Sequence, residues 1–200
     1  MNAYRLSCCL LMIMLSGIFF DCTNTPAEQY KALERAELES GVRYDSLFKG
    51  FYFGMKHDKF RDYCYYMNTV KHDFKMQGPN LSWLESEIKE MSYPAAINFY
   101  PVFNEDVITE MNALIYYKDA VFKDRIFEKD SLLLDVLGLM KKWYGKEFIK
   151  IESPDSYKED IYVSVRGNRR ITVYPTINLS QEIKVWMVDL YAKGKQTEKK

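Results

Sequence analysis

The first twenty residues contain the feature that most constrains this chain, a stretch without any charged side chain. Leu6 to Phe20 holds no Asp, Glu, Lys or Arg, and it follows a short N-terminal region with one positive charge at Arg5. These 15 residues would rise about 22 Å as an α-helix, which is short of the roughly 30 Å of membrane hydrocarbon. The stretch therefore predicts the hydrophobic region of a signal peptide, and the folded domain must be built from the residues that follow it.

Small residues near the end of this stretch, followed by a cysteine, predict a bacterial lipoprotein signal. Ser16 and Gly17 are the small residues, and Cys22 is the residue that would carry the lipid. Asp21 is a poor residue at the cleavage position, so secretion after cleavage and an uncleaved membrane anchor stay open as alternatives. We expect residues 1–21 to be a signal peptide. The protein is then exported and lipid-anchored, on the periplasmic side or in the outer membrane of a bacterial envelope.

The composition excludes several classes of protein. The chain has 28 basic and 28 acidic side chains and a formal net charge of zero, whereas a sequence-independent nucleic-acid binder needs a basic surface that neutralises phosphates. Two histidines without a recognised ligand spacing give no reason to expect a metal or another cofactor. Two of the four cysteines lie in the leader, so the exported part has no disulfide framework. Attachment to the membrane would come from a lipid rather than from a basic surface.

Residues 22–43 are expected to form a lipid anchor and a helical tether. Thr25 can cap the helix, and Glu28 completes a capping box. Pro26 suits the first helical position, and Gly41 allows a left-handed end. Few apolar residues interrupt the charged surface of this helix. The pattern therefore predicts a helix that lies loosely between the membrane and the domain.

The hydrophobic pattern that follows predicts an α+β domain over residues 44–192. One helix near residues 57–68 and another from Asp130 to Tyr144 are each followed by apolar or alternating segments typical of strands. We expect the helices to pack on one face of an antiparallel sheet, as two tandem helix-plus-meander repeats, residues 44–118 and 128–192. Residues 193–200 are expected to be a frayed, charged tail. The expected strands are residues 70–76, 95–103, 107–117, 148–151, 161–165, 171–174 and 183–191.

Several segments resemble known exported proteins. The pattern F-x-x-G-M before a helix, within residues 47–55, is similar to the start of small exported α+β modules. These include the β-lactamase-inhibitor-protein-like fold and the small lipoproteins of the outer-membrane assembly machinery. A second resemblance, to uncharacterised lipoproteins of Bacteroidetes-type bacteria, covers most of residues 37–191 and implies no activity and no catalytic residue. It is carried by residues 40–48, 98–101, 142–145, 148–151 and 167–171.

Cys64 is the first candidate for a catalytic group, and its neighbours argue against this role. His57 lies two helical turns before Cys64, roughly 10 Å away along the axis, which is too far for direct proton transfer. We therefore expect Cys64 to be a buried core thiol. The paired acids Glu105 and Asp106 are typical of a solvated hairpin turn. The chain has no Gly-rich phosphate loop, nucleophile elbow or HExxH motif, so we predict no catalytic residue and no metal ligand.

Two groups of side chains predict an interaction surface. Three tyrosines lie so close together on one helix that they cannot all face the core, and exposed tyrosine suits recognition of a protein or glycan. Three arginines flank a predicted turn, where they could meet an acidic partner or lipid headgroups, or could simply be solvated. The two groups are Tyr63, Tyr65 and Tyr66, and Arg166, Arg169 and Arg170.

These observations favour a non-enzymatic binding module of the cell envelope. Its expected partners are the membrane, through a lipid on Cys22, and an envelope protein or glycan. A small envelope enzyme that uses Cys64 or a carboxylate is one alternative, and an inhibitor of a periplasmic enzyme is another.

Overall fold

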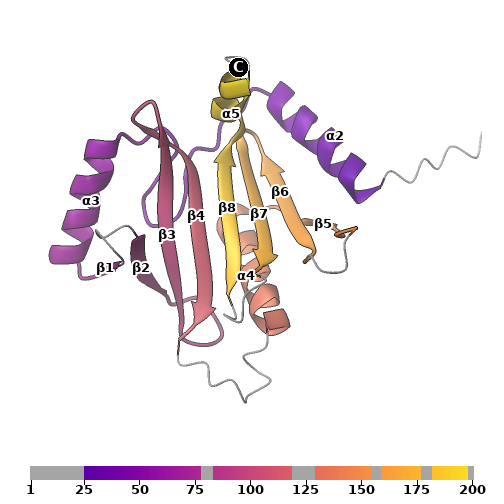
Figure 1. The fold of residues 1–200 in the computed structure, drawn as a ribbon. Coiled ribbons are helices and arrows are strands. Elements are labelled where there is room, and N and C mark those ends of the chain that lie inside the picture. Colours follow the sequence, from indigo (N-terminus) through magenta and orange to yellow (C-terminus); the bar gives the residue numbers. More distant parts are fainter. Residues whose placement is uncertain (1–24, 78–82, 119–128, 155–158, 177–181, 198–200) are drawn as a thin grey trace, which may run out of the picture.

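Eight antiparallel strands form a single sheet, and helices pack against it (Figure 1). The structure is a computed structural model that describes residues 25–77, 83–118, 129–154, 159–176 and 182–197. Neighbouring strands follow the order β1-β2-β3-β4-β8-β7-β6-β5. The predicted α+β class and antiparallel sheet are confirmed.

Each half of the domain contributes one helix and then four strands to this sheet. The two halves meet where β4 pairs antiparallel with β8, for example at Met111 and Met187. The first half, after an N-terminal helix, consists of α3 (His57–Thr69), β1 (Phe74–Gln77), β2 (Trp83–Ile88), β3 (Ala95–Asn104) and β4 (Val107–Tyr117). The second consists of α4 (Lys129–Tyr144), β5 (Ile149–Ile151), β6 (Ile161–Arg166), β7 (Arg169–Pro175) and β8 (Ile183–Asp189).

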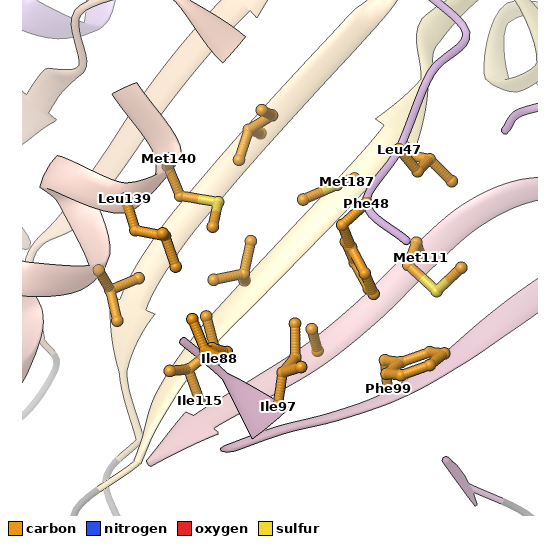
Figure 2. Close-up of a cluster of buried hydrophobic side chains, with 14 of the residues drawn as sticks. Leu47, Phe48, Ile88, Ile97, Phe99, Met111, Ile115, Leu139, Met140 and Met187 are labelled. Carbon is orange, nitrogen blue, oxygen red and sulfur yellow. The ribbon is translucent and has the colours of Figure 1, made fainter. Parts of the chain in front are cut away.

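The main core lies between one face of the sheet and the helices α3 and α4. Strand residues alternate between the two faces, and those on this face are fully buried, Ile115 and Met187 among them. Helix α4 directs Leu139 and Met140 into the same layer (Figure 2). Burying one large apolar side chain stabilises a fold by about 1.5–3 kcal/mol. The broad apolar stripe of α4 therefore fixes this helix on the sheet.

Aromatic rings connect α3 to the sheet. Phe51, in the loop before α3, contacts Phe60 of the helix with ring centroids 5.2 Å apart and Phe74 of β1 at 5.7 Å. Gly50 takes a φ of +84°, and a Cβ there would lie 2.7 Å from the Tyr63 hydroxyl. The loop can approach α3 this closely because residue 50 has no side chain.

The N-terminal helix α2 (Pro26–Glu39) packs on the opposite face of the sheet. Its predicted capping box between Thr25 and Glu28 is present. The helix does not lie loosely as a tether, because its apolar side chains cover β5 and β6. Helices therefore occupy both faces, and the prediction of a single covered face is wrong. The second apolar cluster consists of Val163, Val165 and Leu190, with Tyr30, Leu33, Leu38, Ile151 and Ile161 packed against it.

Sequence reasoning missed this contact because α2 has few apolar residues, and none of its side chains is fully buried. The strands below it supply the missing apolar surface. Val163 and Val165 alternate with core-facing residues of β6, so one strand serves two hydrophobic layers.

The last strand ends earlier than predicted, at Asp189, and a short helix α5 (Leu190–Thr197) follows. The Asp189 carboxylate accepts a hydrogen bond from the Tyr191 backbone N–H at 3.1 Å. It thus caps the start of the helix, as Asp does at many helix N-termini. The expectation of a strand to residue 191 is wrong for residues 190 and 191, and the charged tail from residue 193 stays a prediction.

Glu37 anchors α2 to the sheet through charged hydrogen bonds. Its carboxylate accepts from the Gly167 backbone N–H at 2.7 Å and from the Lys146 ammonium at 3.0 Å. Burial opposes ionisation, but these two hydrogen bonds outweigh it and lower the pKa of Glu37 below its ordinary value. The ionised carboxylate is therefore the form that holds the helix.

We predict that Glu37→Gln lowers the free energy of unfolding by about 1–2 kcal/mol at pH 7. Because the folded-state pKa is depressed, this stability is present above the unfolded-state pKa of about 4.3 and is lost as the pH falls through the folded-state pKa. The difference between the variant and the parent should therefore shrink below about pH 4. Urea denaturation across this pH range measures it. Glu39→Gln, an exposed change on the same helix, is the control, and a difference independent of pH would contradict the role of the charge.

Candidate functional site

A cavity of about 510 Å³ lies where the loop after α2, the end of α4 and the strand ends of β6 and β7 meet. This volume is within the range of small-molecule sites in proteins. Its lining combines aromatic rings with positively charged groups. The lining residues are Tyr44, Ser46, Leu47, Phe48, Lys49, Glu90, Trp143, Tyr144, Arg166 and Arg169.

A polar cluster around one buried amide, the Asn168 clamp, holds the loop that forms one wall of this cavity. The clamp consists of Arg43, Tyr44, Asp45, Asn168 and Asp189. The Asn168 side chain, which is fully buried, donates to Asp45 at 3.0 Å and to Asp189 at 3.1 Å. Its amide oxygen accepts from the Tyr44 backbone N–H at 2.6 Å. Both ends of the amide are therefore satisfied, as a buried amide requires.

Arg43 completes the clamp by pairing with both carboxylates. Its guanidinium donates to Asp45 at 2.7 Å and to Asp189 at 2.9 Å. These hydrogen bonds raise the pKa of Arg43. The charge of the buried Asp189 is thus compensated, which a buried carboxylate needs if it is to stay ionised.

The turn between β6 and β7 passes very close to the loop. Gly167 has a φ of +55°, and a Cβ at this position would lie 2.3 Å from the Val42 carbonyl oxygen. A side chain there would both strain the backbone and push the loop away from the turn. The predicted tight turn at residues 166–169 is therefore confirmed, and its glycine is required by contact.

Arg169 is the most unusual residue of the cavity, because its charge is buried. Only 4% of the residue is exposed. Its Nη1 donates to the Ser46 carbonyl at 2.6 Å, and the guanidinium lies 4.3 Å from the centre of the Tyr144 ring. Its Nε is buried and has no hydrogen-bond partner among the described residues, and the same holds for the Nε of Arg170. Burial lowers the pKa of Arg169, although an arginine keeps its charge at any physiological pH.

Arg166 places a second guanidinium in the same cavity. It lies 4.2 Å from the centre of the Tyr44 ring and donates to the Tyr144 carbonyl at 3.1 Å. Two other arginines close by form ion pairs with carboxylates, Arg43 with Asp189 and Arg170 with Glu34. Within the described residues, neither Arg166 nor Arg169 has such an ion pair.

The three arginines predicted as one surface do not act together. Arg170 points to the other face of the sheet, where its Nη1 donates to the Tyr30 hydroxyl at 3.1 Å and it lies 5.3 Å from the Trp186 ring. It joins α2 to the sheet, whereas Arg166 and Arg169 line the cavity. The alternative of a merely solvated turn does not describe these side chains, which lie against rings and backbone carbonyls.

The three predicted tyrosines also separate. Tyr63 packs against the core and donates its hydroxyl to the Lys49 carbonyl at 2.9 Å. Burial raises the pKa of Tyr63. Tyr65 is 67% exposed, and Tyr66, 42% exposed, has the Lys71 ammonium over its ring. Only Tyr65 and Tyr66 are available as the surface predicted from the sequence.

Cys64 is 2% exposed, and burial raises the pKa of its thiol to about 12. A nucleophilic cysteine needs the opposite shift. His57 packs its ring against Phe103 at 4.8 Å instead of approaching Cys64. Glu105 and Asp106 lie in the predicted turn between β3 and β4, and both have a positive φ. In the part of the chain that the structure describes, no three His, Cys, Asp or Glu side chains gather as metal ligands would.

Sequence reasoning missed the aromatic walls of the cavity. In the sequence, Tyr44 belongs to an apolar loop and Trp143 to an amphipathic helix. Nothing in either pattern predicts that the two side chains line the same cavity. One signal was available, however. Arg169 stands at the position where β7 alternation demands a core residue, two places before Ile171 and four before Val173. A charged residue in such a register marks either strain or a site.

No protein-family model, no curated protein and no solved structure matches this chain. The two resemblances noted in the sequence stay predictions. Cys22 and residues 1–21 lie outside the described residues. Over the described ranges, the helices are too short or too polar to cross a membrane.

We predict that Gly167→Ala lowers the free energy of unfolding by more than about 2 kcal/mol, because positive φ and contact with Val42 both oppose a Cβ. Gly138→Ala is the matched control. Gly138 lies in α4, and a Cβ added there would meet nothing within 4 Å, so alanine at this position should stabilise the protein by up to about 1 kcal/mol. Urea denaturation measures both. Equal effects of the two changes would contradict the close approach of turn and loop.

We also predict that Cys64 resists alkylation. At pH 8 the folded protein should leave the Cys64 peptide unmodified by iodoacetamide, because the thiol is buried and un-ionised. Denaturant should make the same peptide react fully, and peptide mass spectrometry reads both states. Rapid modification of Cys64 in the folded protein would show that its thiolate is accessible.

Proposed function

We propose that this protein is a lipid-anchored binding module of a bacterial cell envelope, and that its binding site is the cavity between residues 44–49 and the β6–β7 turn. One observation carries the proposal. Arg169 is buried in the wall of this cavity beside Arg166, and within the described residues neither guanidinium forms an ion pair. A buried charge without an ion-paired partner is costly, and such a departure from the usual rules of packing is typical of functional sites.

The chemistry of the lining supports binding rather than catalysis. General acid–base catalysis needs a proton donor or acceptor whose pKa is close to the working pH. The lining residues include no histidine or cysteine, and Glu90 is their one carboxylate. Permanently charged guanidinium groups and aromatic rings instead provide orientation and contact area. The raised pKa of Cys64 counts against the alternative of a thiol enzyme.

The leader supports the anchor, and the fold adds a consequence. Because α2 packs on the sheet, the spacer between Cys22 and the folded domain shrinks to Thr23, Asn24 and Thr25. Three extended residues reach at most about 11 Å. A lipid on Cys22 would therefore hold the domain against the membrane surface, in place of the loose attachment expected from the sequence.

The proposal keeps the two tandem repeats predicted for residues 44–118 and 128–192. Both halves run from one helix into four antiparallel strands. The sheet order supports this interpretation, because β4 and β8, the last strand of each half, are paired at the centre while β1 and β5 form the edges. In a repeat protein of this kind, the cavity lies between the two repeats, because its lining comes from the first loop of residues 44–118 and from α4 and the β6–β7 turn of residues 128–192.

Site-specific photo-crosslinking in intact cells tests the proposed function. A photoreactive residue replaces Glu90, an exposed residue of the cavity lining. Tyr65 and Glu152, both well exposed on other surfaces, are the comparison positions. We expect an adduct from position 90 and none from position 152. Mass spectrometry of the mature N-terminal peptide, taken from the same sample, should show a diacylglyceryl group on Cys22.

Two results would overturn the proposal. A free N-terminus near residue 18 removes the anchor. An adduct from position 65 with none from position 90 would place the binding surface on α3. The partner would then bind the tyrosine surface predicted from the sequence, and not the cavity.

A further inference from the structure

Two positive charges share the cavity without an ion-paired carboxylate among the described residues. The Tyr44 ring faces both guanidinium groups, with its centre 4.2 Å from Arg166 and 5.9 Å from Arg169. Each of the two charges disfavours the other, and burial of Arg169 makes the repulsion harder to screen. Lys49 also lines the cavity, but its ammonium is paired with Asp73 at 3.0 Å. The two arginines are therefore the cavity cations without an ion pair among the described residues. Glu37 near Arg166 and Asp45 near Arg169 offset part of their charge from beyond ion-pair distance.

The guanidinium of Arg169 has the shape of an oxyanion receptor. A guanidinium offers two parallel N–H groups along the edge formed by Nε and one terminal nitrogen, and this fork matches two oxygens of a carboxylate or phosphate. The structure uses Nη1 for the Ser46 carbonyl and leaves Nε without a partner. The stacking of the guanidinium near Tyr144 and the Ser46 hydrogen bond fix its orientation, so little freedom is lost on binding.

Aromatic side chains define what would surround the anionic group. Phe48 and Trp143 lie in the cavity lining with their rings 6.3 Å apart, and Tyr44 covers the arginine side. Such surfaces contact the apolar or ring-shaped body of a ligand. Glu90, at the exposed side of the lining, would disfavour a second negative charge there. The site thus suits a molecule with one anionic end and one apolar end.

We infer that the cavity binds a small organic oxyanion, a carboxylate or a phosphate ester, which pairs with the guanidinium groups of Arg166 and Arg169 while its apolar part lies against Tyr44, Phe48 and Trp143. This inference rests on the proposed function and names its ligand class. An Nε without a partner does not by itself mark a site, because Arg170, which joins α2 to the sheet, has one as well. A purely structural arginine would explain the Tyr144 contact and the Ser46 hydrogen bond, but not a second guanidinium beside it that also lacks an ion pair among the described residues.

Isothermal titration calorimetry on the mature full-length protein tests the inference with three matched probes. Benzoate and phenyl phosphate carry the two oxyanions on one ring, and benzamide is the neutral counterpart of benzoate. We expect saturable binding of at least one anion and at least tenfold weaker binding of benzamide. Stronger binding of benzoate assigns a planar carboxylate, and stronger binding of phenyl phosphate assigns a phosphate ester.

Three variants locate the binding. Arg166→Gln removes a half-buried charge without emptying the core and should weaken the preferred anion at least tenfold. Arg169→Lys keeps the charge but loses the fork, and it should also weaken binding. Arg61→Gln, on α3 with a side chain 69% exposed, removes the same charge elsewhere and should leave affinity unchanged. Circular dichroism establishes that each variant is folded.

The inference fails if neither anion binds more tightly than benzamide to the folded protein, or if Arg166→Gln binds like the parent. This failure is separable from failure of the proposed function. An adduct at position 90 together with a lipid on Cys22 would then keep the binding module and exclude only the oxyanion. If position 90 also gave no adduct, both the oxyanion ligand and the proposed binding site in the cavity would be excluded.

Discussion

The hydrogen bonds around Asn168 are the constraint on which the rest of this structure depends. One buried side chain joins the loop before α3, the β6–β7 turn and the end of β8, through Tyr44, Asp45 and Asp189. The Asn168 carbonyl also accepts from the Leu190 backbone N–H at 2.8 Å, where α5 begins. Segments more than 120 residues apart in the sequence are thus held by a single amide. Such a network is stable only when every member is satisfied.

The clamp explains why a cavity can exist beside it. Loops seldom hold their shape without packing of their own, but residues 43–46 are fixed by charged and partly buried hydrogen bonds. Gly167 lets the turn approach Val42, and Glu37 of α2 binds the same turn from the other face of the sheet. The walls are rigid for this reason, and a rigid wall is what pre-organised recognition requires.

Alternation along β7 places neighbouring arginines in unlike surroundings. Arg170, on the α2 side, has a ring, a hydroxyl and a carboxylate as partners. Arg169, on the α4 side, has a ring and a backbone carbonyl. The first contributes to docking of the N-terminal helix, whereas the second has no ion-paired carboxylate among the described residues, and a bound oxyanion would supply one. Helix α2 rises about 20 Å from its start to its end. A lipid on Cys22 would therefore attach near one end of α2, with the cavity near the other.

The sequence by itself determined the local elements, because they depend on interactions between near neighbours. The capping box at Thr25, the turn at residues 104–106, the hairpin of β3 and β4 and the turn at Gly167 all follow from short-range patterns, and the structure contains each of them. The burial of Cys64 also followed from the helical spacing of its apolar neighbours.

Only the tertiary structure decided how these elements combine. Whether α2 is a tether or part of the domain depends on the apolar face of β6, which lies more than 100 residues away. The separation of Arg169 from Arg170 depends on which face of the sheet each helix covers. The cavity needs Tyr44, Trp143 and Arg166 from three distant segments. The hydrophobic periodicity of one segment does not predict which other segments it will contact. The long-range pairing of strands and the hydrogen bonds of the buried Asn168 bring these three segments together.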